Sequence, residues 1–177
     1  MSESFQNFKR AITDAQELLN CYDTINTSET NLPVPEVLKR ACLIMTLTAW
    51  ETYVEDIATE LFQNKYSVLK GSQIGNFLEL QFNNRLKIFH NPDSAKTKQL
   101  FEDFFGIDVT EQWNFPNYIP KQARETLNLW LKKRGDAVHR AKTDLIQPHI
   151  VKRDELDKCI RFISELASVT DKALMAL

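Results

Sequence analysis

The stretch Ala41-Cys-Leu-Ile-Met-Thr-Leu-Thr-Ala-Trp50 decides the fold class of this 177-residue chain. Coiled into a helix, it would carry apolar or small side chains on nearly every side. A helix of that kind lies at the centre of a bundle, because on the surface it would expose apolar side chains to water. We therefore expect a central and most buried helix over about residues 35–66, opened by Pro35, since proline is tolerated in the first turn.

Helical periodicity of apolar residues continues on both sides of this segment, and Gly and Pro separate the periodic stretches. With only 4 Gly and 6 Pro in the chain, a many-turned β-sandwich is disfavoured. In chain order, the predicted helices span about 4–22, 35–66, 76–90, 94–105, 120 to at least 134, and 152–177. We predict an all-α fold, a bundle of five to six helices in a single domain over 1–177, with its core at about 35–170.

Two stretches without helical periodicity are predicted to be loops. Residues 23–35 are rich in Thr, Ser and Asn and contain two prolines. Residues 107–119 contain Trp113, Phe115, Pro116 and Tyr118. Because aromatic rings are costly to leave in water, we expect 107–119 to be an aromatic-rich loop packed on the bundle.

Composition is typical of a soluble protein from a reducing compartment. Hydrophobic residues make up 43% and charged residues 26% of the chain. The three cysteines, Cys21, Cys42 and Cys159, are odd in number and far apart, which argues against a disulfide framework. The first residues do not form a signal peptide, and the apolar stretch 41–50 is too short to cross a bilayer. We expect a cytoplasmic protein without a membrane partner.

The formal net charge of −2 provides no overall basic field to attract nucleic acid. Any RNA contact must therefore depend on local charge. One basic cluster exists, formed by Lys132, Lys133, Arg134, Arg140 and Lys142. The cluster is either a solvated helix face or, with its lysines and Arg140, an RNA-binding surface.

The familiar motifs of metal and cofactor enzymes are absent. The sequence has no Gly-rich phosphate loop, no His-Glu-x-x-His, no Cys-x-x-Cys and no Gly-x-Ser-x-Gly. None of the three histidines, His90, His139 and His149, is spaced with another His or Cys as a zinc site requires. Glu51 and Glu55 are one helical turn apart, but the Glu-x-x-His motif of di-iron bundles is missing. We expect neither a metal nor a cofactor.

An arginine interrupts the apolar stripe of the helix that begins at Pro120. The stripe includes Leu127 and Leu131, and its pattern calls for an apolar residue at position 134, where the chain has Arg134. A guanidinium in a core stripe is costly unless it is paired or faces a cleft. Alternatively, Arg134 lies at the helix end with its stem packed and its head in water.

His139 follows five residues after Arg134. In a straight helix the two side chains would differ by about 140° in direction and about 7.5 Å in height. They would reach one target only if the helix bends. Gly135 is a poor helix former and is placed where such a bend could occur.

The segment Arg134-Gly-Asp-Ala-Val-His139 resembles the Arg-x(4–6)-His signature of the HEPN superfamily of small helical bundles. A second stretch, Thr48-Ala-Trp-Glu-Thr-Tyr-Val-Glu-Asp56, is similar to the Glu-containing first core helix of the RiboL-PSP-HEPN type of families. The resemblance covers about residues 35–170 and implies a HEPN-like bundle. The chain departs from the pattern at Gly135, because HEPN members usually place a polar residue, often Asn or Asp, directly after the arginine.

Many HEPN members are ribonucleases of toxin–antitoxin, abortive-infection and other defence systems. The resemblance therefore implies a metal-independent endoribonuclease, acting as a toxin or in antiviral defence. It implies that Arg134 binds the phosphate and that His139 transfers the proton, since imidazole titrates near neutral pH. Asp136 would orient His139 or lie on the surface, and Glu51 would position Arg134 or line the cleft.

The resemblance further implies a homodimer in which two Arg–His pairs line one cleft, and it leaves room for an antitoxin protein as a partner. Two other interpretations stay open. The first is a non-catalytic HEPN protein that binds RNA or nucleotide, or pairs with a nucleotidyltransferase-type antitoxin, and Gly135 supports it. The second is a helical interaction module in which Arg134 and His139 are surface residues. For Glu51, the alternative is a purely structural role in which its carboxylate pairs with a basic group.

Overall fold

The computed structural model describes residues 1–27, 36–139 and 150–176. Over these ranges the chain forms six α-helices and two short 3-10 helices, and its one β-type feature is an isolated bridge between Phe115 and Tyr118. The helices are α1 (Glu3–Thr27), α2 (Glu36–Tyr66), η1 (Ser67–Leu69), α3 (Gln73–Lys87), α4 (Ser94–Phe105), η2 (Val109–Gln112), α5 (Pro120–His139) and α6 (Arg153–Leu174). The predicted all-α bundle of five to six helices is confirmed.

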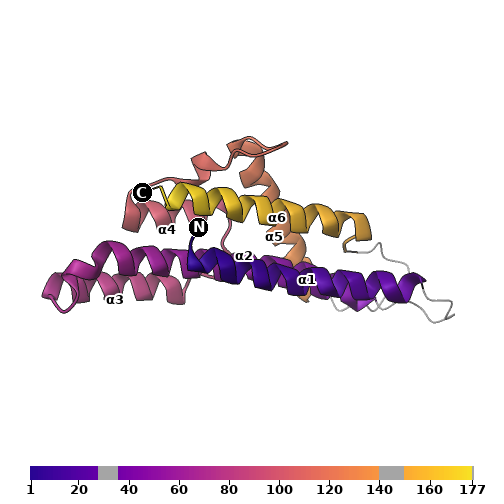
Figure 1. The fold of residues 1–177 in the computed structure, drawn as a ribbon, viewed down its shortest axis with the longest axis horizontal. Helices are drawn as coiled ribbons and strands as arrows, with labels where there is room; N and C mark the ends of the chain where they lie inside the picture. The colour runs from indigo at the N-terminus through magenta and orange to yellow at the C-terminus, as the bar shows by residue number, and fades with distance from the viewer. Residues whose placement is uncertain (28–35, 140–149, 177) are drawn as a thin grey trace.

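The bundle is elongated, with α1 and α2 lying lengthwise along each other (Figure 1). Helix α6 runs along this pair, and α5 crosses behind α6. Helix α2 contacts α1, α4, α5 and α6. None of the helices in the described ranges combines the length and the hydrophobicity needed to cross a membrane.

The middle of α2 is enclosed, as its apolar sequence predicts. Leu43, Leu47, Trp50, Val54 and Ile57 are all fully buried. The helix as a whole is nevertheless not the most buried one, because 12 of its 31 residues are buried against 10 of 22 in α6. The expectation that α2 has the largest buried fraction is therefore wrong for the helix as a whole, although its middle is enclosed as predicted. The fraction is lower because the C-terminal part of α2 extends past the bundle.

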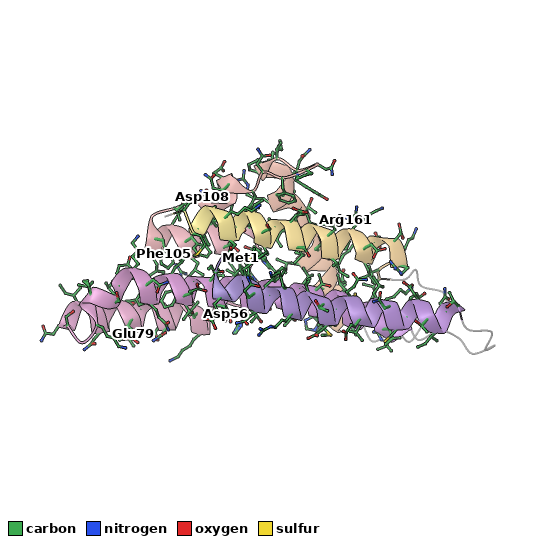
Figure 2. All side chains as sticks on the ribbon, in the orientation of Figure 1. Met1, Asp56, Glu79, Phe105, Asp108 and Arg161 are labelled. Carbon is green, nitrogen blue, oxygen red and sulfur yellow. The ribbon has the colours of Figure 1, made fainter. Side chains whose placement is uncertain are left out.

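Helix α3 lies against this extension of α2 at one end of the molecule, far from Arg161 of α6, as the position of Glu79 shows (Figure 2). Phe82 is the one buried side chain of α3. Its ring stacks on Phe62 of α2 with centroids 4.3 Å apart and meets Phe104 of α4 edge-on at 5.1 Å. Phe82 thus anchors a helix that is otherwise largely exposed.

Glycines set two helix ends. Gly106 has a φ of 74° and ends α4 in the left-handed conformation, as expected from the sequence. Gly75 lies inside the first turn of α3, where Ser72 caps its backbone N–H. A Cβ at position 75 would lie 2.0 Å from the Leu69 carbonyl oxygen, so only glycine fits this close approach.

Helix α1 continues to Thr27, five residues further than predicted. A tertiary contact stabilises the additional turn, because the Asp23 carboxylate pairs with the Arg153 guanidinium of α6 at 2.6 Å. The hydrogen bond from Arg153 lowers the pKa of Asp23, so this stabilisation is present at neutral pH and is lost as the pH falls through that lowered pKa. The prediction of a loop at 23–27 is wrong because the pattern of apolar residues contains no sign of this pair.

The aromatic-rich segment packs on the bundle as predicted. Trp113 is fully buried, its indole Nε1 donates to Thr170 Oγ1 at 3.0 Å, and its ring lies 6.0 Å from the ring of Trp50. Phe115 is also buried and packs on Phe162 of α6. Segment 107–119 therefore covers the outer side of the core.

We predict that Phe82→Ala releases α3 from the bundle. Loss of a buried phenylalanine costs about 3–5 kcal/mol, and the other apolar side chains of α3 that pack on the core, Leu78 and Leu86, are only partly buried. Hydrogen–deuterium exchange over residues 73–87 should accelerate at least tenfold. Phe77→Ala is the matched control, because Phe77 lies on the same helix and is 60% exposed. Unchanged protection of α3 in the Phe82 variant would contradict this account of how the helix is held.

Candidate active site

Arg134 lies on the buried face of α5, as the apolar stripe in the sequence predicts. Leu127, Trp130 and Leu131 are buried on this face of α5, and Arg134 is the next residue along it. Its side chain is 20% exposed. A guanidinium with so little contact with water needs a partner within the protein.

Glu51 of α2 is that partner. The Arg134 Nη1 lies 2.7 Å from Glu51 Oε2, and the Glu51 side chain is 16% exposed. The structure thus joins two residues that are 83 positions apart in the chain. The contact agrees with a role of Glu51 in positioning Arg134 as well as with a purely structural pairing.

A third residue, Asn91, closes the cluster. Its backbone N–H donates to Glu51 Oε1 at 2.8 Å, and its side-chain Oδ1 accepts a hydrogen bond from Arg134 Nη1 at 3.3 Å. Asn91 has a φ of 58°, in the left-handed region. The sequence predicts that a helix ends at about residue 90, but it gives Asn91 no role in the site. The available signal was an Asn directly before a proline, since Asn tolerates this conformation better than most residues.

The loop that carries Asn91 is fixed to the core. The indole Nε1 of Trp50 donates to the carbonyl oxygen of Pro92 at 3.0 Å. Asp93 caps α4 by accepting from the Lys96 backbone N–H at 2.8 Å. Lys96 Nζ in turn donates to the His90 carbonyl oxygen at 2.5 Å. These contacts hold the loop in which His90, an exposed histidine, directly precedes Asn91, the residue that contacts both Glu51 and Arg134.

His139 lies at the exposed end of α5. The helix runs unbroken through Gly135 to His139, so the break that would turn both side chains to one target is absent from this part of the described chain. Five residues of regular helix separate Arg134 and His139 by about 140° and about 7.5 Å. Asp136 is half-buried between them. A Cβ at Gly135 would meet nothing within 4 Å, so packing does not require glycine there.

The basic cluster is only partly available to a ligand. Lys133 Nζ pairs with Glu155 of α6 at 2.7 Å and lies 4.9 Å from the Trp130 ring centroid. Lys132 is exposed. Arg140 and Lys142, both predicted to bind RNA, lie outside the described residues. Lys133 therefore contributes to packing between α5 and α6, which a count of basic residues cannot reveal.

A second acidic residue of α2, Glu55, lies near the pair. Glu55 lies one turn beyond Glu51, where burial raises the pKa of Glu55 and the Glu51 carboxylate raises it further. The nearby imidazole of His90 lowers the pKa of Glu55 and so partly offsets these two effects. Among the described residues, no group of three His, Cys, Asp or Glu side chains is arranged to hold a metal ion.

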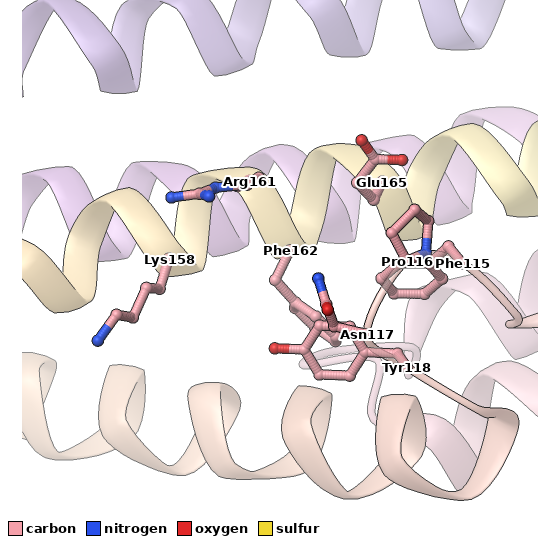
Figure 3. Close-up of a pocket in the computed structure, with 8 residues that line it drawn as sticks. All are labelled: Phe115, Pro116, Asn117, Tyr118, Lys158, Arg161, Phe162 and Glu165. Carbon is pink, nitrogen blue, oxygen red and sulfur yellow. The ribbon is translucent and has the colours of Figure 1, made fainter.

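A separate groove of about 240 Å³ lies between the aromatic-rich segment and α6 (Figure 3). Tyr118, Lys158, Arg161 and Glu165 contribute to its walls. Its charges are mixed, and none of the predicted site residues lines it. The groove is therefore distinct from the cluster around Arg134.

Comparison with known proteins gives one match. A family model described as RiboL-PSP-HEPN matches residues 9–176, nearly the whole chain. No match is found among curated proteins or among solved structures.

We predict a moderate loss of stability for Arg134→Ala. The variant leaves the poorly exposed Glu51 carboxylate without its cation, which costs about 1–3 kcal/mol for a charged hydrogen bond. The double variant Arg134→Ala/Glu51→Gln should recover part of that loss, and urea unfolding measures the coupling. Arg124→Ala is the control, because Arg124 lies on the same helix and pairs with the exposed Glu111 at 2.6 Å. Equal effects of Arg134→Ala in the presence and absence of Glu51 would contradict the pairing.

Proposed function

Since the chain belongs to the RiboL-PSP-HEPN family, we propose that it is a metal-independent endoribonuclease, serving as the toxin of a toxin–antitoxin or antiviral defence system. The observation that carries the proposal is a guanidinium in the core stripe of α5, held at the protein surface by a carboxylate from α2. A guanidinium at this position supports the proposal because it offers a phosphate both a positive charge and several hydrogen-bond donors.

The chemistry needs few protein groups. RNA supplies the nucleophile, its 2′-hydroxyl, which attacks the adjacent phosphorus and releases the 5′-oxygen. The products are a 2′,3′-cyclic phosphate and a 5′-hydroxyl. The protein must accept one proton, return one to the leaving oxygen and stabilise the negative charge that develops on the phosphate.

Arg134 is assigned to the phosphate and His139 to proton transfer. A guanidinium makes charge-assisted, two-pronged hydrogen bonds to phosphate oxygens. An imidazole changes its protonation state near neutral pH. Lys132 extends the positive charge on the same helix, and Arg140 and Lys142 follow it in the sequence. Asp136 is assigned the orientation of His139.

A second copy of the chain could bring an arginine and a histidine to the same phosphate, although Arg134 and His139 of one subunit point in different directions. In an unbroken helix one subunit directs the two side chains apart, whereas two copies facing each other along α5 can offer the arginine of one and the histidine of the other. Val138 favours this assembly, because it is 52% exposed and lies one turn beyond Arg134 on the same face. We therefore propose a homodimer with a shared cleft.

His90 is the competing candidate for proton transfer. It adjoins Asn91, which contacts both Glu51 and Arg134. If His90 transfers the proton, a single subunit contains a complete site and the dimer is dispensable for catalysis. The two assignments therefore differ in what each histidine variant does.

The cleavage test is an assay on a mixed-sequence RNA in EDTA. The wild type should cut the RNA and leave a 2′,3′-cyclic phosphate, while His139→Ala should lose activity and keep its RNA affinity and melting temperature. Arg134→Ala should lose both turnover and affinity, and Arg134→Lys should rescue poorly because an ammonium lacks the planar fork.

If the His90→Ala variant is inactive while the His139→Ala variant remains active, then His90 is the residue that transfers the proton. RNA binding without cleavage would favour the alternative, a non-catalytic HEPN module that binds RNA, nucleotide or a protein partner. A strict magnesium requirement would exclude the proposed chemistry.

The dimer is tested by light scattering at micromolar concentration. The mass should be about twice the 20.6 kDa of the chain. Val138→Asp should lower the mass and the cleavage rate together, because a carboxylate in an apolar contact is costly. Leu129→Asp is the matched control, since Leu129 is 55% exposed on the opposite side of the same helix. A 20.6 kDa mass at all concentrations, with full cleavage activity, would contradict the shared cleft.

A further inference from the structure

Asn91 has a left-handed backbone conformation, which residues other than glycine adopt infrequently. It is one of two non-glycine residues with a positive φ in the described chain, the other being Asn117. Asn91 also precedes Pro92, which disfavours the right-handed helical conformation at position 91. Strained residues of this kind persist where the surrounding structure holds them, and they often lie at functional sites.

Its surroundings hold Asn91 from several directions. Its carbonyl oxygen accepts from the Asp93 backbone N–H at 2.8 Å, and its own N–H donates to Glu51 at 2.8 Å. The next residue, Pro92, is buried and bonded to Trp50. The side-chain amide is therefore presented to Arg134 from a rigid support.

The contacts of Asn91 and Glu51 determine which N–H donors of the Arg134 guanidinium remain available to a ligand. Arginine has five N–H donors, two of them on Nη1. Nη1 faces Glu51 Oε2 and Asn91 Oδ1. For the donors on Nε and Nη2, no partner is found within residues 1–27, 36–139 and 150–176. Nε and Nη2 together form the fork that binds two phosphate oxygens at once.

We infer that Asn91 is a positioning residue that, together with Glu51, holds Nη1 of Arg134 so that the Nε–Nη2 fork faces the phosphate of bound RNA. The inference rests on the proposed function and deepens it. It also gives the site a polar group that the chain lacks at Gly135, directly after the arginine. Here that group comes from a loop between α3 and α4 instead of from α5.

The neutral amide suits this task better than a second acid would. Glu51 already balances the charge of Arg134, and a further carboxylate at position 91 would repel a phosphate. An amide oxygen accepts the second Nη1 hydrogen without adding charge. Asn91 thus orients the guanidinium while leaving its attraction for phosphate in place.

Asn91→Gly isolates the side chain from the backbone. Glycine adopts a positive φ freely, so the turn and the backbone bond to Glu51 should survive, and only the acceptor for Arg134 is removed. Because misorientation of a catalytic group costs rate more than binding, kcat should fall about tenfold with KM within about twofold. The melting temperature should not fall. Asn117→Gly is the matched control, since it makes the same change at a left-handed Asn with a φ of 72°.

Asn91→Asp supplies the conservative comparison. It keeps an acceptor and tolerates the left-handed conformation, so kcat should stay within about threefold of the wild type. Its added negative charge should raise KM, and raise it more at low salt than at high salt, because salt screens the repulsion. A residue that merely shapes the loop would not separate the two parameters in this way, with Asn91→Gly lowering kcat and Asn91→Asp raising KM, and would not show the salt dependence.

The decisive measurement is a double-mutant cycle with Arg134→Lys. An ammonium has no fork to orient, so Asn91→Gly should lower kcat in the wild type and leave the Arg134→Lys protein unchanged. A wild type that binds RNA without cleaving it overturns this inference, because no turnover is then left for Asn91 to support. An equal effect of Asn91→Gly in both backgrounds, or no effect in either, overturns this inference while RNA cleavage stands. A wild type that neither cleaves nor binds RNA overturns the proposed function and this inference together.

Discussion

The structure depends on the enclosure of Trp50 in the middle of α2. Its ring is fully buried against Trp113, and its indole nitrogen bonds to the carbonyl oxygen of Pro92. One side chain therefore ties the central helix to the aromatic-rich segment and to the loop between α3 and α4. Because Glu51 is the next residue of α2, the same turn of helix that anchors the core also presents the carboxylate that holds Arg134.

This coupling explains how a charged pair persists in a position that periodicity assigns to the core. Arg134 and Glu51 each keep limited contact with water, and the contact between them compensates for part of their lost hydration. An apolar pair of the same size would pack there at least as well. The retention of a charged pair is consistent with use of the site, and the left-handed Asn91 beside it strengthens that interpretation.

The two ends of the molecule differ in how they are stabilised. Around Trp50, helices α1, α5 and α6 cover α2, and side chains of all six helices contribute to one connected core. Beyond Phe62, helix α3 depends on the ring contacts of Phe82 and exposes Ile74, Phe77 and Leu80. Arg134 lies in the part of the bundle where several helices meet, which is where the orientation of a side chain can be held most precisely.

The sequence by itself determined the helical class, the boundaries of most helices, the aromatic cover and the anomaly at Arg134, because these follow from periodicity, Gly and Pro positions and the chemistry of single residues. It also indicated Glu51, as a carboxylate on a mostly apolar stripe. It did not indicate that α1 extends to Thr27, that Lys133 is held by Glu155, or that α5 continues unbroken through Gly135. Only the tertiary structure decided that Asn91 joins Glu51 and Arg134. The contact depends on the path of the chain between α3 and α4, and no local pattern encodes a distance between residues 43 positions apart.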